Sequence, residues 1–408
     1  MEVIYPRCAG LDVHKDTVVA DARIVSGSEI KHNVETFATT TSGLLALEQW
    51  LSAHNVTHVA MEATGVYWKP VWHVLEGSFE LVLANARHIR NVPGRKTDVN
   101  DAMWIADLLA HGLIRGSFVP PEPIQRLRDL TRTRKQLVRE IAQHTQRIQK
   151  TLEDANVKIT GLITDLLGVS GRAIIAALIA GETDPERLAA LAKGRLKIKR
   201  PALIEALRGR VNEHHRFLLK LHLGQIEALE KAREELEQHM GKSLEPMRAK
   251  AELLSTMPGV SDTVAQVILA EIGTDMSRFP TAGHLVSWAG LCPRNDESAG
   301  KRRSTRVRPG APWLKTTLVQ AAWAAARTKN SYLRAQFLRL KSRRGPRKAI
   351  LAVAASMLTA AYHMLRDEVA YNDLGADHFH RRDQTKLVNR LIRRAADLGF
   401  HVEIRPAA

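Results

Sequence analysis

The chain has 408 residues, of which 60 are Lys or Arg and 43 are Asp or Glu, so its formal net charge is +17. With 45% hydrophobic residues it can bury the cores of two or three domains, and so large a basic excess favours nucleic acid as a partner. The two cysteines, Cys8 and Cys292, exclude a disulfide framework and a cysteine-rich metal site, which is typical of a reducing cytosol.

The first 115 residues carry a net charge of −3 and alternate between strand and helix signals. Two strands are predicted around a tight turn at His14 to Asp16, and the first helix has Thr41 or Ser42 as its cap. The expected elements are strands at 8–13, 17–25, 31–40, 56–64 and 79–86, and helices at 40–54, 65–77 and 97–112. This order indicates an α/β domain with a mixed sheet, which we assign to residues 1–117.

From about Pro120 the pattern changes to long helices with almost no strand signal. Aliphatic residues recur with a three-four spacing in two stretches: Leu127, Leu130, Leu137, Ile141 and Ile148, then Ile226, Leu229, Leu236 and Met240. Polar residues interrupt both series, so they indicate either an antiparallel helix pair or a dimerising coiled coil. We expect a coiled-coil linker over residues 118–250, with inserted short helices at 160–214. The basic segment AKGRLKIKR (residues 192–200) is more typical of a solvated surface than of a binding site.

Residues 253–273 predict a helix-hairpin-helix, in which Pro258 and Gly259 form the turn and Ser261 caps the second helix. The exposed amides of such a hairpin suit a phosphate oxygen, although an ordinary helical hairpin is the alternative. A basic loop follows, within residues 291–348 that carry a net charge of +14, and helices are expected at 312–328 and 347–366. We expect a mainly helical C-terminal domain at 251–366 and a basic tail at 367–408.

The longest uncharged run, residues 349–365, is shorter than the ~20 apolar residues of a membrane span and predicts a buried helix. The residues after Met1 lack the pattern of a signal peptide. We therefore expect a cytoplasmic protein with no membrane partner.

Four acidic residues raise the question of a metal site. Asp98 and Asp101 lie three apart in the first turn of a predicted helix, a spacing that on its own indicates helix capping first. Asp12 falls in the first predicted strand and Glu62 at the end of the fourth, where strand side chains can converge on the start of a helix. Four carboxylates packed together would repel one another, and Mg²⁺, which prefers oxygen ligands, would remove that repulsion. Two such ions would stabilise the entering and leaving oxygens of a phosphodiester displacement.

The motifs GLDVHKDTVVA, MEATGVYWKP, KTDVNDAMWIADLLAHG, LLSTMPGV and WAGLCPRNDESAGKRR resemble the DEDD-type transposases of the IS110 insertion-sequence family. The long middle segment and ESAGKRR are similar to its IS1111-like branch, and the resemblance runs from about residue 8 to 365. It implies an RNase H-like (RuvC-like) N-terminal domain, a coiled-coil linker and a C-terminal transposase domain. It also implies that Asp12, Glu62, Asp98 and Asp101 bind two Mg²⁺ ions, for which Mn²⁺ can substitute.

The family carries a serine nucleophile, and its motif matches Ser298 within NDESAG. Without the resemblance, Ser298 would be interpreted as a solvated loop residue with Ser304 and Thr305 nearby. A serine hydroxyl needs activation, which the metal ions would supply. Family members assemble as tetramers and use an element-encoded noncoding RNA to bridge donor and target DNA. The resemblance therefore implies DNA, that RNA and further copies of this chain, in a dimer or tetramer, as partners.

Basic side chains beside Ser298 would neutralise phosphates near the scissile bond through sequence-independent, salt-dependent contacts. They are Lys301, Arg302, Arg303, Arg306 and Arg308. Gly300 and Gly310 would allow the backbone near a duplex, and Gly259 would contribute the hairpin amides. Trp68 and Trp72 could stack on bases, but their helical spacing favours core packing.

These observations predict a transposase or recombinase that mobilises an insertion sequence by RNA-guided, magnesium-dependent strand cleavage, with Ser298 forming a covalent phosphoserine. One alternative is a RuvC-like junction resolvase or nuclease that uses water as the nucleophile. Another is an assembly factor that binds RNA and DNA and whose carboxylates are structural.

Overall fold

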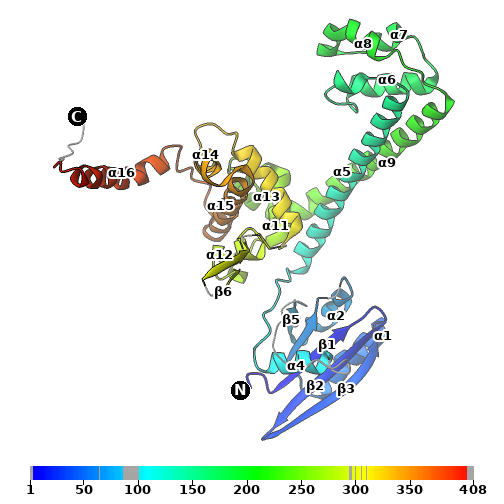
Figure 1. Ribbon diagram of the computed structural model, residues 1–408. Helices are drawn as coiled ribbons and strands as arrows, with labels where there is room; N and C mark the ends of the chain where they lie inside the picture. Colours follow the sequence, from blue (N-terminus) through cyan, green and yellow to red (C-terminus); the bar gives the residue numbers. More distant parts are fainter. Residues whose placement is uncertain are drawn as a thin grey trace. The chain divides into compact units, whose positions relative to one another are not determined.

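The computed structural model describes residues 3–63, 65–85, 101–293, 296–298, 300–304, 306–308 and 310–401, and for 296–298, 302, 303, 380 and 382–387 it describes the backbone. Asp98 therefore lies outside the described residues. The chain divides into two compact units, Met1–Val119 and Pro120–Ala408, each of which is considered by itself (Figure 1). The finer division of the second unit at residues 250 and 366 stays a prediction.

The first unit is a five-stranded mixed sheet in the order β3-β2-β1-β4-β5. Strand β2 is antiparallel to both of its neighbours, whereas β4 and β5 continue the sheet parallel to β1. The elements are β1 (Arg7–Val13), β2 (Thr17–Ser26), β3 (Glu29–Ala38), α1 (Thr41–Ala53), β4 (His58–Glu62), α2 (Trp68–Leu75), β5 (Glu80–Ala84) and α4 (Asp101–Ala110). The expected α/β domain with a mixed sheet is confirmed, and this strand order is consistent with an RNase H-like domain.

The sheet has a hydrophobic core on each of its two faces, because successive side chains of a strand point to opposite faces. One face packs against α1 and α2 through residues such as Leu11, Val59, Met61, Leu47 and Val71. The other packs against α4 through Cys8, Ala60, Ala84, Ile105 and Leu109. Trp68 and Trp72 pack against the first core with their rings edge to face at 5.8 Å, which confirms the expected core packing.

The cap of α1 differs from the prediction by one residue. Thr40 is the N-cap, and its Oγ1 accepts the N–H of Gly43 at 3.3 Å. Thr41 already belongs to the helix, and so does Ser42. The run of three threonines before Ser42 offers several equivalent hydroxyls, so local sequence does not select among them.

In the second unit two long helices, α5 (Glu122–Asp154) and α9 (Glu213–Leu244), pack side by side and run antiparallel (Figure 1). Arg134 Nε lies 2.7 Å from Glu237 Oε1 near one end, and His215 Nε2 lies 3.0 Å from Asp154 Oδ2 at the other. Of the two predicted alternatives, the antiparallel helix pair is thus present within one chain. A coiled coil between chains stays a prediction.

Short helices lie between α5 and α9 in the sequence, as predicted: η1 (Ile159–Gly161), α6 (Val169–Ala180), α7 (Pro185–Ala190), η2 (Gly194–Lys199) and α8 (Arg200–Ala206). They share one hydrophobic core with the adjoining end of the α5–α9 pair, where Ile148 and Leu152 meet Ile174, Leu203 and Leu219. The insertion is therefore a small folded body at that end of the pair (Figure 1).

After α9 the chain forms η3 (Glu245–Met247), α10 (Arg248–Ser255), α11 (Asp262–Ile272), η4 (Met276–Arg278), α12 (Ala282–Trp288), β6 (Asp296–Ser298), β7 (Lys301–Ser304), α13 (Pro312–Ala325), α14 (Tyr332–Arg344), α15 (Pro346–Asp367) and α16 (His378–Asp397). The basic loop was expected to lack regular structure, and the β6–β7 hairpin corrects that prediction. Helices α14 and α16 were not predicted. Only Leu333 and Phe337 of α14 are buried, so its hydrophobic periodicity is weak.

Helix α15 is the one helix of the described part of the chain that is long and apolar enough to cross a membrane by length and composition. Over half of its apolar window, 56%, is buried inside the protein. Tyr362 donates its hydroxyl hydrogen to the carbonyl oxygen of Phe279 at 3.0 Å, which ties α15 to the segment after η4. The predicted buried helix is therefore confirmed.

Candidate active site

Two of the predicted acidic residues occupy matched positions on neighbouring strands. Strands β1 and β4 are parallel and pair up to Leu11 and Met61, so Asp12 and Glu62 follow that pair directly at the carboxyl ends. Adjacent strands lie about 4.8 Å apart, and matched side chains point to the same face. Ala60 faces α4, and Glu62, two residues on, shares that face.

Helix α4 runs antiparallel to β1 across this face of the sheet. Cys8 Sγ lies 3.5 Å from the Ala106 carbonyl oxygen, and a Cβ on Gly10 would lie 2.1 Å from the carbonyl oxygen of Ala102. Two residues of strand advance about 6.6 Å, which matches about four residues of helix. One further step brings Asp12 to the amino end of α4, where Asp101 lies in the first turn.

Asp12, Glu62 and Asp101 are therefore carried by β1, β4 and α4 to one end of the same face. The side chain of Asp12 is 23% exposed, and its Oδ2 lies 3.2 Å from His14 Nε2. Their carboxylate oxygens are the ligands that Mg²⁺ prefers, so this donor set fits a hard divalent cation. Asp98 lies outside the described residues, and within those residues no three potential ligands are grouped closely enough to hold an ion. The complete four-residue site stays a prediction.

Sequence analysis did not identify a buried polar cluster that fixes α4 on the sheet. Arg23 Nε donates to Asp107 Oδ1 at 2.8 Å, and His32 Nδ1 lies 2.8 Å from Asp21 Oδ2. Asp21 and Arg23 are fully buried, and burial raises the pKa of Asp21 while the hydrogen bond with His32 opposes the rise. The signal was available in TVVADARIV, where both charged residues fall on the strand face opposite Val18 and Ala20.

Ser298 lies in a strand whose partner carries the first of the basic residues. It pairs with Lys301 of β7, and Gly300, directly before Lys301, has a φ of +72°. Glycine adopts a positive φ without the strain that a Cβ would cause. Lys301, Arg306 and Arg308 are exposed, and the backbone of Arg302 and Arg303 belongs to β7.

The two ends of the segment that carries the β6–β7 hairpin are held together by close backbone packing. Pro293 and Val307 form an isolated β-bridge, and Lys315 Nζ donates to the Arg308 carbonyl oxygen at 3.0 Å. A Cβ on Gly310 would lie 2.4 Å from the amide nitrogen of Gly290. Gly310 thus makes room for the protein's own backbone. This packing explains the glycine, and the close approach of Gly310 to a DNA duplex stays a prediction.

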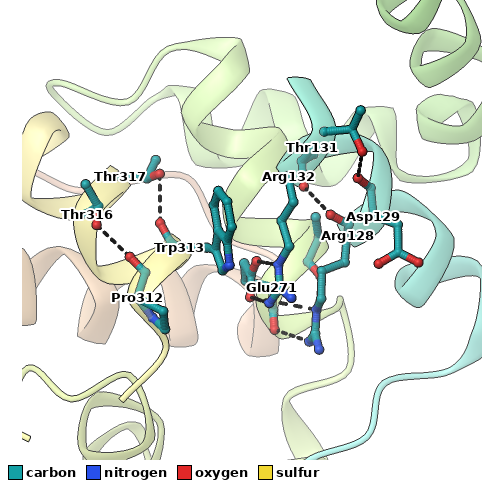
Figure 2. A network of polar contacts seen from close by, with 11 residues as sticks. Arg128, Asp129, Thr131, Arg132, Glu271, Pro312, Trp313, Thr316 and Thr317 are labelled. Carbon is teal, nitrogen blue, oxygen red and sulfur yellow. Dashed lines mark hydrogen bonds and ion pairs between the residues drawn. The ribbon is translucent and has the colours of Figure 1, made fainter. Parts of the chain in front are cut away.

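A buried carboxylate joins α11 to α5 beside the start of α13 (Figure 2). Glu271 is 1% exposed, and both of its oxygens accept hydrogen bonds of 2.9 Å from Arg132. Arg128 donates to the carbonyl oxygens of Ala270 and Glu271 at 3.1 and 2.7 Å. The single carboxylate of Glu271 therefore compensates one of the two positive charges of Arg128 and Arg132 in the interface.

Trp313, in the first turn of α13, lies against a row of cations on α5. The charged groups of Arg132, Lys135 and Arg139 lie 5.6, 5.6 and 5.3 Å from the centroid of its ring. Such cation–π contacts contribute about 0.5–2 kcal/mol each, more where water is excluded. Burial, and then repulsion by Arg139, lowers the pKa of Lys135. Helix α13, which follows the β6–β7 hairpin with Ser298, is thereby attached to α5.

The predicted helix-hairpin-helix corresponds to α10, a turn and α11. Gly259 has a φ of +83°, and a Cβ on it would lie 2.4 Å from the Ala321 carbonyl oxygen of α13. Ser261 occupies the N-cap position of α11, but its side chain makes no capping hydrogen bond. Packing against α13 is sufficient to explain the glycine. Its contact with a phosphate stays a prediction.

Comparisons with known proteins add a family relationship. A family model of DEDD transposases of the IS110 type matches residues 9–157, and a model described as "Transposase IS116/IS110/IS902 family" matches residues 251–338. The chain is 33% identical over 123 residues to the "Insertion element IS110 uncharacterized 43.6 kDa protein" of Streptomyces coelicolor. It is 30% identical over 121 residues to the "Pilin gene-inverting protein" of Moraxella bovis. These alignments cover 29% of this chain and 29% and 37% of the two relatives, well under two thirds of either.

Proposed function

Because the chain belongs to the IS110 family of transposases, we propose that it mobilises an insertion sequence by cleaving and exchanging DNA strands. The observation that supports this proposal is that Asp12 and Glu62 follow paired residues of β1 and β4 at the edge of the sheet face that packs against α4, whose first turn contains Asp101. Inversion of a gene, the activity in the name of the Moraxella relative, is also a rearrangement of DNA.

In this proposal Asp12, Glu62, Asp98 and Asp101 hold divalent metal, and Mg²⁺ in two copies is the form that we favour, with Mn²⁺ as a substitute. Bound ions would stabilise the charge that develops on the entering and leaving oxygens of the phosphodiester. The protein contributes rigidity, because Asp12 and Glu62 project from hydrogen-bonded strands and Asp101 from a helix that Arg23 and Gly10 hold against the sheet.

Ser298 is the proposed nucleophile. Its Oγ forms a bond to phosphorus as the bond between phosphorus and one DNA oxygen breaks, and the hydroxyl proton leaves with the departing oxygen or solvent. The cleaved strand then has one free hydroxyl end and one end joined to the protein. A hydroxyl of another strand attacks the phosphoserine, which restores Ser298. Lys301, Arg302, Arg303, Arg306 and Arg308 would neutralise neighbouring phosphates.

The finer partners belong to the same proposal. An element-encoded noncoding RNA would select donor and target DNA by base pairing, so the protein would read little sequence itself. The acids of one protomer would act on DNA attacked by the serine of another, in a dimer or tetramer. Such an enzyme would work in the cytoplasm.

The test is a suicide substrate, a nicked DNA duplex whose cleaved fragment diffuses away and so traps a covalent intermediate. Wild-type protein should form a protein–DNA adduct that resists boiling in detergent, and Ser298→Ala should form none. Ser304→Ala is the matched control, because Ser304 lies on the paired strand β7 and should leave the adduct intact. Cleavage by wild type without any adduct would instead support a nuclease that uses water.

The metal site needs a second comparison. Asp12→Asn should abolish adduct formation, whereas Asp16→Asn, at an exposed position in the turn after the same strand, should not. Adducts should also require Mg²⁺ or Mn²⁺ and disappear with a chelator. Adducts in Asp12→Asn at the wild-type rate would remove the carboxylates from the chemistry.

A further inference from the structure

A pocket of about 530 Å³ lies among the short helices between α5 and α9. Three segments form its walls: residues 162–165 after η1, residues 168–170 at the start of α6, and residues 193–199, which include η2. All of them belong to the inserted body at the end of the helix pair (Figure 1). The strand-exchange chemistry proposed above uses none of these residues.

The pocket is lined by cations from one basic segment. Residues 193–200 contain five Lys or Arg and no acid, and Lys193, Arg195 and Lys199 line the pocket with exposed side chains. Across the described ranges, none of the five forms an ion pair with an Asp or Glu side chain. The acid in the wall, Asp165, accepts the N–H of Leu167 at 3.0 Å and so stabilises its own turn. The local field is therefore strongly positive and attracts anions.

The amino end of α6 reinforces this field. The helix spans twelve residues and begins after Gly168, which has no side chain to cap it. Ser170 Oγ accepts the N–H of Lys193 at 2.9 Å, which holds the basic segment beside the first turn. Free N–H groups and the positive end of the helix dipole add to the charge of the lysines and arginine.

The form of the surface favours a chain of phosphates over a single small anion. Lys193 and Lys199 are six residues apart in a segment that is mostly a 3₁₀-helix, which corresponds to two turns and about 12 Å, so both can face the pocket over a length greater than one small anion. Two large apolar side chains stand beside them: Val169 is 68% exposed and Ile198 is 84% exposed. Apolar side chains next to phosphate-binding cations suit contact with sugars or unstacked bases.

We propose that this pocket binds the phosphodiester backbone of a nucleic acid, with Lys193, Arg195, Lys199 and the amino end of α6 contacting successive phosphates. The inference rests on the proposed function only because a transposase has nucleic-acid partners. It gives the protein a second proposed nucleic-acid surface, built from residues other than those of the β6–β7 hairpin. It also reverses the sequence-based interpretation of residues 192–200 as a solvated surface.

The experiment compares two double variants of the full-length chain that remove the same charges from the same segment. Arg195→Ala with Lys199→Ala removes two cations that line the pocket, and Lys197→Ala with Arg200→Ala removes two that do not. All four side chains are exposed, so both variants should fold like wild type, which circular dichroism checks. Binding is measured by fluorescence anisotropy with a labelled RNA hairpin and a DNA duplex of equal length, across a series of KCl concentrations.

The pocket variant should lose about tenfold in affinity at 0.1 M KCl, and the slope of log K against log salt should fall by about 1.5–2, as expected for two lost phosphate contacts. The control variant should lose less than about threefold, because its cations act only through the long-range field. A larger loss with the hairpin assigns the pocket to RNA, a larger loss with the duplex assigns it to DNA, and equal losses assign it to the backbone shared by both.

Equal losses in the two variants, or no loss in either, would overturn the proposal. Binding requires no strand cleavage, so failure of the serine chemistry would leave this result unaffected. If wild-type protein bound neither nucleic acid, the proposed function and the pocket would both be refuted.

Discussion

Glu271→Gln is the substitution that tests the connection between α5 and α11. The change keeps the shape of the side chain and removes its charge. Arg132 then faces an amide that accepts at one atom only, while Arg128 loses a carboxylate whose nearest oxygen lies 3.7 Å from its Nε. The buried carboxylate therefore becomes a neutral group beside two cations.

The size of the effect follows from burial. Removing one partner of a fully buried ion pair costs about 3–5 kcal/mol, because the other charge stays without compensation. Arg132 is 33% exposed and can turn part of its guanidinium to water, whereas Arg128 is 16% exposed and keeps its carbonyl partners. We expect a loss of about 2–3 kcal/mol in the free energy of unfolding of the second unit.

The matched control is Glu237→Gln. Glu237 also accepts from an arginine of α5, Arg134 Nε at 2.7 Å, but it is 42% exposed, so its loss should cost under about 1 kcal/mol. Urea unfolding followed by circular dichroism at 222 nm measures both. The reasoning is refuted if Glu271→Gln costs no more than Glu237→Gln, or if a double-mutant cycle with Arg132→Met shows no coupling energy above that of the Glu237 pair.

Three further outcomes are expected. Burial and the adjacent histidine of α5 lower the pKa of His222, so the folded state prefers the neutral ring, and the free energy of unfolding should be highest above pH 6.5 and fall as the pH drops below it. In urea titrations between pH 7.5 and 5, His222→Asn should flatten that slope, whereas the exposed His239→Asn should not. Burial raises the pKa of Cys8 to about 12, so a disulfide exchange reagent at pH 8 should label one thiol per native chain, that of Cys292, and two thiols after denaturation. Rapid labelling of two thiols in the native chain would contradict the buried position of Cys8. Gly10→Ala should destabilise the first unit by about 1–3 kcal/mol, because the new Cβ has no room beside the α4 backbone. A midpoint of unfolding equal to that of wild type would show that α4 does not pack against Gly10.

The first unit was largely predictable because its hydrophobic residues follow the periodicity of the strands and helices that they form. Alternating side chains along β1 and β2 specify both faces of the sheet, and the same alternation assigns Asp12 to the α4 face once Gly10 meets that helix. The matched positions of Asp12 and Glu62 at the ends of neighbouring strands could not be derived from spacing. They depend on the parallel pairing of β1 with β4, which joins residues about fifty positions apart.

The contacts of the second unit were less predictable, for physical reasons that differ between elements. The β6–β7 hairpin is short and highly charged, so neither strand has the apolar alternation that identifies one. Glu271 sits within an apolar helix, and its partners Arg128 and Arg132 lie on another helix about 140 residues earlier. A single sequence does not indicate which residues so far apart in the chain form a contact. Signals for Ser298 came from the family motif alone, and its chemistry remains a prediction.

The close approach of α4 to Gly10 has a practical consequence for anyone who surveys genomes for intact copies of such elements. A copy can keep every acidic residue and the serine, and so pass a motif search, yet have a destabilised first unit because the hydrogen atom at Gly10 was exchanged for a methyl group. Lists of functional copies should therefore weigh that glycine as heavily as the residues with charge.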